Sequence, residues 1–182
     1  MTEKEKMLAG ELYLAETPEL EAAHRRAIEL CEKLNFGRLS DEEREKTVRE
    51  LLGKCGKTVV LRRGFWCDYG ENIEVGENFY VNYDVVILDV CKVKIGDNCL
   101  IAPQVGIYTA AHPLDKEVRA SGLEYGKPVT IGNNVWIGGR AVILPGVTLG
   151  DNVVVGAGSV VTKSFPSDVV IAGNPAKIIK QL

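Results

Sequence analysis

A charged stretch of twenty residues, TAAHPLDKEVRASGLEYGKP at positions 109–128, contains one of the two histidines of the chain. Because imidazole has a pKa near ~6.5, His112 is suited to taking up and returning a proton at neutral pH. Pro113 disfavours a helical backbone at His112 and predicts an extended one, which holds the imidazole outward. These residue types indicate general acid–base chemistry at His112, and the alternative is a polar loop residue with no chemical task.

The second histidine and the cysteines give little support for a metal site. His24 precedes Arg25 and Arg26 in a charged segment, which favours a surface residue, with substrate contact as the alternative. The cysteines form no CxxC pair and the chain has only two histidines, so few ligands are spaced to hold zinc. We therefore expect no metal. We expect reduced and mostly buried thiols, as in a cytoplasmic protein. The five cysteines are Cys31, Cys55, Cys67, Cys91 and Cys99.

The overall composition predicts a globular protein with one core and a small appended segment. The 182 residues are 46% hydrophobic and carry a net charge of −3 without a basic stripe, so nucleic-acid binding is not expected. No apolar run approaches the roughly 18 residues of a membrane span, and the N-terminus lacks a hydrophobic signal segment. We therefore expect no membrane association.

Charge density divides the chain near residues 53–57. Residues 1–56 carry 23 charged side chains, whereas the 126 residues from 57 to 182 carry only 24. Helix-cap signals in the first segment predict three amphipathic helices. These helices begin after Thr2, Thr17 and Ser40, and the first and third end at Gly10 and Gly53. We expect a helical segment over 1–56 and a second domain over 57–182, with an excursion loop at 109–128.

The second segment has a repeat of six residues. Branched aliphatic residues recur at this interval, often followed by a glycine or another small residue. The register consists of Ile95, Ile101, Ile107, Ile131, Ile137, Ile143, Leu149, Val155 and Val161. An earlier run of Val75, Val81 and Ile87 is offset from it by two positions. From Ile107 to Ile131 is 24 positions, four repeats, so the excursion preserves the phase.

A six-residue period matches neither an α-helix nor an ordinary strand. A short strand followed by a tight turn gives this period, with one aliphatic side chain pointing inward at each step. Gly, Asn and Asp tolerate the backbone angles of such turns. Stacked coils of this kind form a parallel β-helix, in which each coil buries its apolar side chains only against its neighbours. The open ends of a solenoid need covering, and the N-terminal helices are placed to do so.

At this point the chain resembles a known family. The six-residue repeats are similar to the hexapeptide repeat of left-handed β-helix acyltransferases. Several segments resemble the maltose and galactoside O-acetyltransferases: EKMLAGELY, CDYGENIEVGENFYVNYDVVILD, TAAHPLD, SGLEYGKPVTIGNNVWIGGRAVILPGVTLGDNVVVGAGSVVTK and IAGNPAK. The resemblance implies a left-handed helix and transfer of an acetyl group from acetyl-CoA to a sugar hydroxyl. It also implies a homotrimer with active sites between subunits, each completed by a loop from the neighbour.

The resemblance assigns the acceptor side of the site. It implies that His112 is the general base and that Asn82 lies near both the sugar hydroxyl and the thioester. Further acceptor contacts are expected from carboxylates and a phenol, namely Asp68, Tyr80, Asp89 and Glu124. The alternative for Asp68 and Asp89 is a role as turn residues at the corners of coils.

The resemblance also assigns the donor side. Trp136, Gly139 and Ala157 match the coils that carry the pantetheine arm, and a backbone N–H near Gly139 is the expected oxyanion contact. The phosphates of the coenzyme are expected to meet a hydroxyl and several cations, namely Thr162, Lys163, Lys177 and Lys180. Lys177 and Lys180 stand where relatives often have arginine, and the alternative is that they are solvated surface charges.

Three positions depart from the galactoside pattern. Galactoside acetyltransferases bind the sugar with an Asp and an Arg from the N-terminal helices, where this chain has Ala15 and His24. The Asp that follows the matched Asp89 in that subgroup is Val90 here. These differences favour a maltose-like or glucose-like acceptor.

Other functions on the same fold are less well supported. A γ-type carbonic anhydrase needs three histidines around a metal, which two histidines in one chain cannot supply. An acetyltransferase of a non-sugar hydroxyl, such as that of an antibiotic, would lack the MLAGELY-type segment. A non-catalytic β-helix scaffold remains the third possibility.

Overall fold

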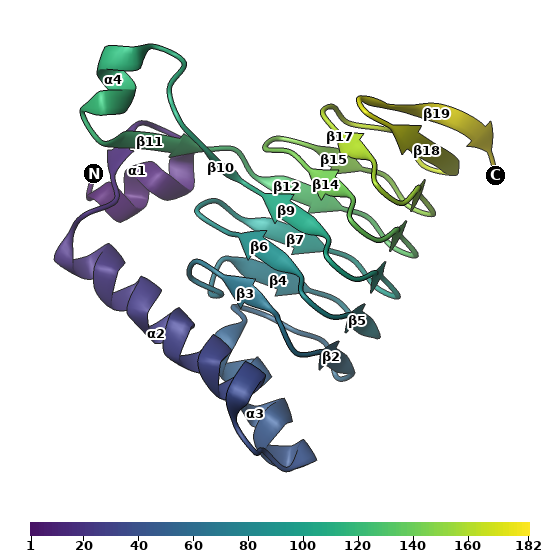
Figure 1. The fold of residues 1–182 in the computed structure, drawn as a ribbon, viewed down its shortest axis with the longest axis horizontal. Coiled ribbons are helices and arrows are strands. Elements are labelled where there is room, and N and C mark those ends of the chain that lie inside the picture. The colour runs from purple at the N-terminus through teal and green to yellow at the C-terminus, as the bar shows by residue number, and fades with distance from the viewer.

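The computed structural model describes residues 1–182 and has three helices in its N-terminal segment (Figure 1). They are α1 (Glu3–Ala9), α2 (Pro18–Phe36) and α3 (Asp41–Leu51). The predicted starts are confirmed, since the hydroxyl oxygens of Thr2, Thr17 and Ser40 accept from the backbone N–H three residues on. The predicted end of α1 is also confirmed, because Gly10 adopts a left-handed conformation with φ 77°.

The predicted role of Gly53 as the end of α3 is wrong. The helix ends one residue earlier, with Leu52 as an extended C-cap. A Cβ atom at Gly53 would lie 2.1 Å from the backbone oxygen of Glu71, so glycine is needed here for the close approach of α3 to the first coil. The constraint comes from packing rather than from helix termination.

The second segment is a left-handed parallel β-helix, which confirms the predicted fold class. Each coil contributes one strand to each of three faces. The four-stranded face contains β4 (Ile73–Val75), β7 (Val93–Ile95), β12 (Val129–Ile131) and β15 (Thr148–Leu149). The five-stranded face contains β3 (Trp66–Cys67), β6 (Val86–Leu88), β9 (Gly106–Tyr108), β14 (Val142–Ile143) and β17 (Val160–Val161).

The seven-stranded face extends furthest along the axis. It contains β2 (Val59–Leu61), β5 (Phe79–Val81), β8 (Leu100–Ile101), β13 (Trp136–Ile137), β16 (Val154–Val155), β18 (Val169–Gly173) and β19 (Ala176–Gln181). All of its pairs are parallel except the last, in which β19 turns back on β18. This hairpin closes the C-terminal end of the coil stack.

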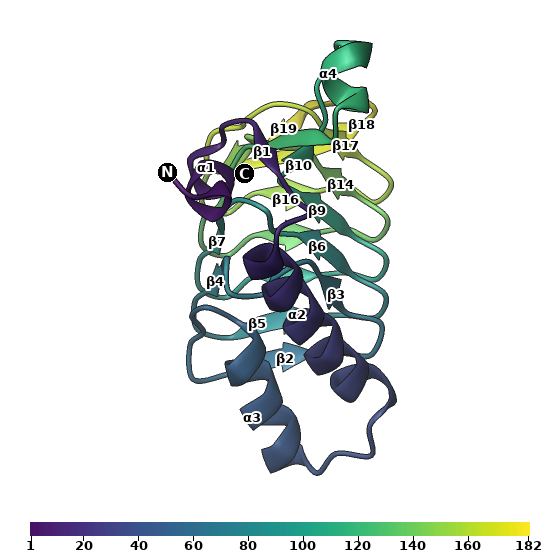
Figure 2. The same ribbon diagram turned by 90° about the vertical axis from the view of Figure 1, so that its left-hand side faces the viewer.

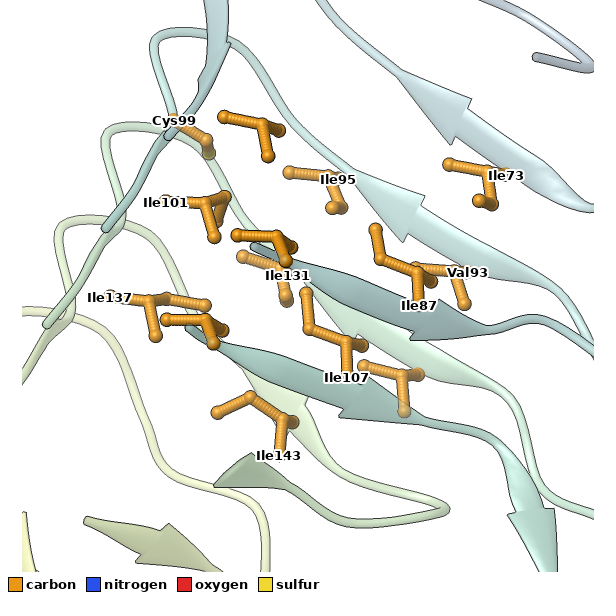
Figure 3. Close-up of a cluster of buried hydrophobic side chains, with 14 of the residues drawn as sticks. Ile73, Ile87, Val93, Ile95, Cys99, Ile101, Ile107, Ile131, Ile137 and Ile143 are labelled. Carbon is orange, nitrogen blue, oxygen red and sulfur yellow. The ribbon is translucent and has the colours of Figure 1, made fainter. Parts of the chain in front are cut away.

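The predicted register of inward aliphatic side chains is confirmed. All of the predicted members are buried, from Val75 to Val161. Equivalent positions pair directly between coils, as Ile95 pairs with Ile131 and Ile101 with Ile137. Figure 3 shows these isoleucines stacked in the space between the faces, so each coil completes the core of the next.

Asparagines at one corner hold the coils in phase. Asn78, Asn98 and Asn134 all have φ between 55° and 57°, in the left-handed region that asparagine tolerates. Their side chains bond from coil to coil, with Nδ2 of Asn78 donating to Oδ1 of Asn98 at 2.9 Å. Nδ2 of Asn98 donates in turn to Oδ1 of Asn134 at 3.2 Å.

The helices cover the N-terminal end and one flank of the β-helix, as Figure 2 shows. Buried residues of α2 and α3, including Leu34 and Leu51, belong to the same hydrophobic core as the coils. A smaller cluster forms where the excursion meets the helical segment, and it contains Met7, Tyr13, Leu20, Tyr69, Val90 and Cys91. No helix in the chain is both long and apolar enough to cross a membrane.

The excursion leaves the coils after β9 and returns at β12. It contains β10 (Ala110–Ala111), α4 (Lys116–Ala120) and β11 (Leu123–Gly126), and α4 projects beyond the coils (Figure 1). Its strands pair antiparallel with each other, and β11 also pairs with β1 (Tyr13–Leu14). The N-terminal segment and the excursion therefore form one small sheet.

Replacing Gly53 with alanine tests the close approach of α3. The φ of Gly53 is not positive, so alanine has no backbone penalty there, and only the contact with Glu71 opposes it. We expect the free energy of unfolding, measured in urea, to fall by about 1–3 kcal/mol. Unchanged stability would mean that the contact with the backbone of Glu71 does not require glycine at position 53.

Candidate active site

One corner of the β-helix is enlarged in three successive coils. It lies between the five-stranded and four-stranded faces. The inward residues that flank it are eight positions apart in the first two coils and 24 apart in the third, against six in the fourth. These pairs are Cys67 and Val75, Ile87 and Ile95, Ile107 and Ile131, and Ile143 and Leu149. The extra residues of the three coils carry Asp68, Asp89, His112 and Glu124, so the enlarged corner holds most of the predicted acceptor-side residues.

A cavity of about 360 Å³ opens at this corner, between the coils, α2 and the small sheet. Its walls combine carboxylates, phenols and apolar side chains, a mixture suited to a polar organic ligand. The lining residues are Tyr13, Ala15, Glu16, Leu20, Glu21, His24, Asp68, Tyr69, Leu88, Val90, Ala110 and Glu124.

Two of the predicted acceptor residues, Asp68 and Glu124, meet in this cavity. Burial raises the pKa of Asp68 to about 6, and the negative charge of Glu124 adds to the increase. The hydroxyl of Tyr13 donates to Oε2 of Glu124 over 3.1 Å. Burial raises the pKa of Tyr13 and of Tyr69, so both phenols remain protonated donors. The cavity thus offers donors and acceptors to a hydroxylated ligand.

Asp89 lies beneath the cavity rather than in its lining. Its Oδ1 accepts from the backbone N–H groups of Asp68 at 3.0 Å and Tyr69 at 2.9 Å. Its Oδ2 is buried without a hydrogen-bond partner, and burial raises the pKa of the carboxyl to about 7. Within one chain, Asp89 therefore holds the widened corner in shape, as the alternative of a turn residue anticipates.

His112 stands at the rim of the same corner. It follows β10 directly and its side chain is exposed. Ala111, the last residue of β10, pairs with Tyr125 in an antiparallel register. Continuing this register by one residue places His112 across from Glu124. The imidazole is thereby carried on a paired strand that lies beside the acidic wall of the cavity.

Asn82 and several other predicted residues lie on the opposite edge of the five-stranded face. Asn82 follows β5 at the corner between the seven-stranded and five-stranded faces, and its Oδ1 accepts from the backbone N–H of Tyr83 at 2.8 Å. Gly139 and Ala157 occupy the same corner two and three coils further on, and Tyr80 faces outward from β5 beside it. Within one chain, these residues therefore lie apart from the cavity and from His112.

The width of the face sets that separation. β6 runs between Asn82 and Asp89, and its three residues span roughly 10 Å. Within one chain, the two predicted catalytic residues therefore lie at opposite edges of the five-stranded face.

The predicted residues for the pantetheine arm, Trp136, Gly139 and Ala157, lie on or beside that second corner, and we refer to them as the donor strip. Trp136 is 53% exposed, and a Cβ atom added at Gly158, whose backbone N–H donates to the backbone oxygen of Gly139 at 2.9 Å, would meet nothing within 4 Å. The predicted phosphate-binding residues are all exposed: Thr162 and Lys163 follow β17, and Lys177 and Lys180 lie on β19. The ammonium of Lys163 lies 5.7 Å from the ring centre of Phe165. No group of three or more His, Cys, Asp or Glu side chains is arranged to hold a metal ion.

The structure adds residues that the sequence did not single out. Tyr13 and Tyr69 line the cavity, and only their positions in segments matched to the family pointed to them. His24 is exposed, as expected of a surface residue, yet it also lines the cavity, with its ring 6.1 Å from that of Tyr69. All three departures from the galactoside pattern, at Ala15, His24 and Val90, are in this one lining.

Comparison with known proteins identifies close relatives over the full chain. Residues 6–56 match the maltose acetyltransferase hexapeptide capping motif, and residues 128–163 match the hexapeptide repeat of succinyl-transferase. Nodulation protein L of Rhizobium meliloti is 51% identical, over 97% of this chain and 97% of that protein.

Two solved structures superpose closely on the chain. A maltose O-acetyltransferase from Clostridium difficile 630 is 53% identical with a TM-score of 0.97, over 100% of this chain and 98% of that one. A galactoside acetyltransferase in complex with coenzyme A is 42% identical with a TM-score of 0.95, over 100% and 91%.

The buried carboxyl of Asp89 predicts a pH dependence of stability. Its pKa is about 7 in the folded chain against 3.8 for an ordinary aspartate, so folding favours the protonated form. The stability that this group contributes is present below about pH 4 and is lost as the pH rises through about 7. In urea unfolding between pH 4 and 8, Asp89→Asn should weaken this decline. The exposed Glu32→Gln is the control, and an identical pH profile for wild type and Asp89→Asn would contradict the assignment.

Proposed function

Because this chain belongs to the maltose and galactoside O-acetyltransferase family, we propose that it transfers an acetyl group from acetyl-CoA to a hydroxyl of a sugar. The observation that carries the proposal is the enlarged corner, where a cavity of about 360 Å³ with carboxylate and phenol walls lies beside His112. Carboxylates and phenols suit the hydroxyls of a sugar. The chain is thus an acetyltransferase of this type, and the sugar acceptor is the proposed part.

The donor strip fits a coenzyme with a long flexible arm and phosphates. Exposed Trp136 and the small residues Gly139 and Ala157 leave room for the arm to lie along the corner. The exposed Lys163, with Lys177 and Lys180 on β19, provides positive charge for phosphate groups. Acetyl-CoA supplies the activated acetyl group there, and the bound coenzyme A of the galactoside acetyltransferase supports this choice.

We assign His112 as the general base. A sugar hydroxyl is a weak nucleophile until its proton leaves, and an imidazole at the rim of the cavity is positioned to accept it. His112 then returns the proton to the departing thiolate.

The developing negative charge on the acetyl oxygen needs a fixed donor. A backbone N–H at Gly139 and the side-chain amide of Asn82 lie on the corner opposite the cavity and serve this purpose. Because Asn82 and His112 lie at opposite edges of the five-stranded face, the proposed reaction uses His112 of one subunit and Asn82 of the next. The proposed assembly is a homotrimer with three such shared sites.

The outer surface of the β-helix supports this assembly. The outward positions of the seven-stranded face form an apolar row, in which Leu100 is 49% exposed. That row consists of Tyr80, Leu100, Trp136, Val154 and Val170. The matching row on the four-stranded face is polar and consists of Glu74, Lys94, Thr130 and Thr148. Apolar outer rows favour contact with another subunit.

The acceptor is proposed to be a maltose-like or glucose-like sugar. The Asp and Arg that bind galactosides in that subgroup are replaced by Ala15 and His24, and both residues line the cavity. Val90 adds an apolar contact at a third point of the same wall. The free thiols of the chain, including the buried pair Cys31 and Cys67, support a reducing compartment such as the cytoplasm.

Replacing His112 with alanine tests the general base. We expect acceptor-dependent release of the CoA thiol from acetyl-CoA to fall by about 10²–10⁴-fold in kcat, because the proton has no other acceptor. Maltose, glucose and galactosides are compared with an assay without acceptor. Lys116→Ala, in the same loop, is the control. Equal turnover of the His112→Ala and Lys116→Ala proteins would rule out the assigned base, and no turnover with any sugar would reject the sugar acceptor.

Mixing two inactive variants tests the shared site. Asn82→Ala and His112→Ala subunits, refolded together in equal amounts, should regain about a quarter of the wild-type activity, because some interfaces then pair an intact Asn82 with an intact His112. Each variant refolded alone stays inactive. The particles should elute at about three times the 19.9 kDa chain mass. Failure to regain activity in co-assembled particles of that size would place both residues in one subunit.

A further inference from the structure

A second cavity, of about 600 Å³, opens where the connection between α2 and α3 crosses β2. Four of its ten lining residues are arginines and none is acidic, although the chain has a net charge of −3. The lining residues are Gly37, Arg38, Leu39, Ser40, Arg44, Val60, Leu61, Arg62, Arg63 and Tyr83. None of these arginines takes part in an ion pair. We refer to this space as the arginine cavity.

The lining of the arginine cavity lacks the acidic residues that its surroundings contain. The adjoining groove along α3 contains Asp41 and Glu45, which are absent from the lining of the cavity. A concave surface lined by cations raises the local concentration of anions. The cavity is therefore the part of this end of the molecule that selects negative charge.

The turn that carries the arginines is fixed in place. Asn35, buried in α2, accepts from the backbone N–H of Gly64 at 2.8 Å and donates to the backbone oxygen of Phe65 at 3.0 Å. These two bonds tie the turn after β2, which carries Arg62 and Arg63, to the helix. The backbone from which Arg62 and Arg63 project is thus held in place.

The four arginines have different roles. Arg44 donates to the backbone oxygens of Leu34 at 2.6 Å and Leu61 at 3.1 Å, so it links α3, α2 and β2. Arg38 and Arg63 are exposed, and their guanidinium groups have no such partners in the chain. Two free guanidinium groups on the walls of one cavity can together hold an anion with several oxygens.

The arginine cavity is continuous with the proposed acceptor residues on this corner. Nε of Arg62 donates to the hydroxyl of Tyr80 over 3.4 Å, and the guanidinium lies 5.7 Å from the centre of that ring. Tyr83, which lines the cavity, donates its backbone N–H to Oδ1 of Asn82. The arginine cavity therefore adjoins the corner that carries Asn82.

We propose that the arginine cavity is a subsite for a phosphate group on the acceptor, so that the preferred substrate is a phosphorylated glucose-type sugar. The phosphate is held by Arg38 and Arg63 of one subunit, while the sugar hydroxyls face the carboxylates Asp68 and Glu124 of the neighbour. The two walls of opposite character orient the sugar in one direction. This inference rests on the proposed function and its shared site.

Acceptor kinetics test the proposal with glucose, glucose 1-phosphate and glucose 6-phosphate. The double variant is Arg38→Gln/Arg63→Gln. Its control, Arg25→Gln/Lys46→Gln, also removes two positive charges, but from exposed positions on α2 and α3. In the wild type and the control, we expect KM for one sugar phosphate to be about tenfold below that for glucose, and this preference should disappear in the double variant. No preference for phosphate in the wild type, or a preference that persists in the double variant, would overturn the proposal.

A binding measurement separates this proposal from the proposed function. Inorganic phosphate is titrated during thermal unfolding without acetyl-CoA. We expect Tm to rise with phosphate for the wild type and the control, and to rise less for the double variant, in which only the coenzyme phosphate site remains to bind the anion. If no sugar is acetylated but the Tm responses to phosphate are as expected, the proposed sugar acceptor is rejected and the phosphate subsite is retained. If glucose is acetylated but phosphate leaves the Tm of the wild type unchanged, the phosphate subsite is rejected and the proposed function is retained.

Discussion

The phase of the inward aliphatic side chains is the constraint on which the rest of the molecule depends. Each coil buries these residues only against the coil above and the coil below, so every strand must return to the same register. The direct pairing of Ile107 with Ile87 and with Ile143 shows that the register survives the excursion between them. Insertions are tolerated only at corners, because a corner can lengthen without moving the strands that flank it.

The active-site cavity is the result of that tolerance. Three consecutive coils lengthen the same corner, and the added residues form a recess above the continuous core. Asp89 holds the floor of the recess through two backbone N–H groups, while Tyr13 and Glu124 form its outer wall. The N-terminal segment therefore does more than cover the open end of the β-helix, since β1 and α2 supply part of the cavity.

The same geometry separates the chemistry into two edges of one face. The cavity and His112 lie at one edge, and Asn82, the donor strip and the arginine cavity lie at the other. Because the two edges lie apart in one chain, the proposed mechanism makes assembly a condition of activity. In the proposed assembly an acidic wall from one subunit faces a basic wall from the next, which gives a substrate with two different ends one preferred orientation.

Local spacing in the sequence determined much of this protein. The caps at Thr2, Thr17 and Ser40, the six-residue register and the resemblance to the family are all confirmed, because each depends on residues close together in the chain or on a repeat of fixed length. The tertiary structure alone decided which distant residues meet. Gly53 is required by the backbone of Glu71, Asp89 lies under the cavity, His24 lines it, and Asn82 lies across a strand from His112. These relations arise from the stacking of coils and the docking of α2, and a pattern of residue types carries no record of contacts between segments so far apart in sequence.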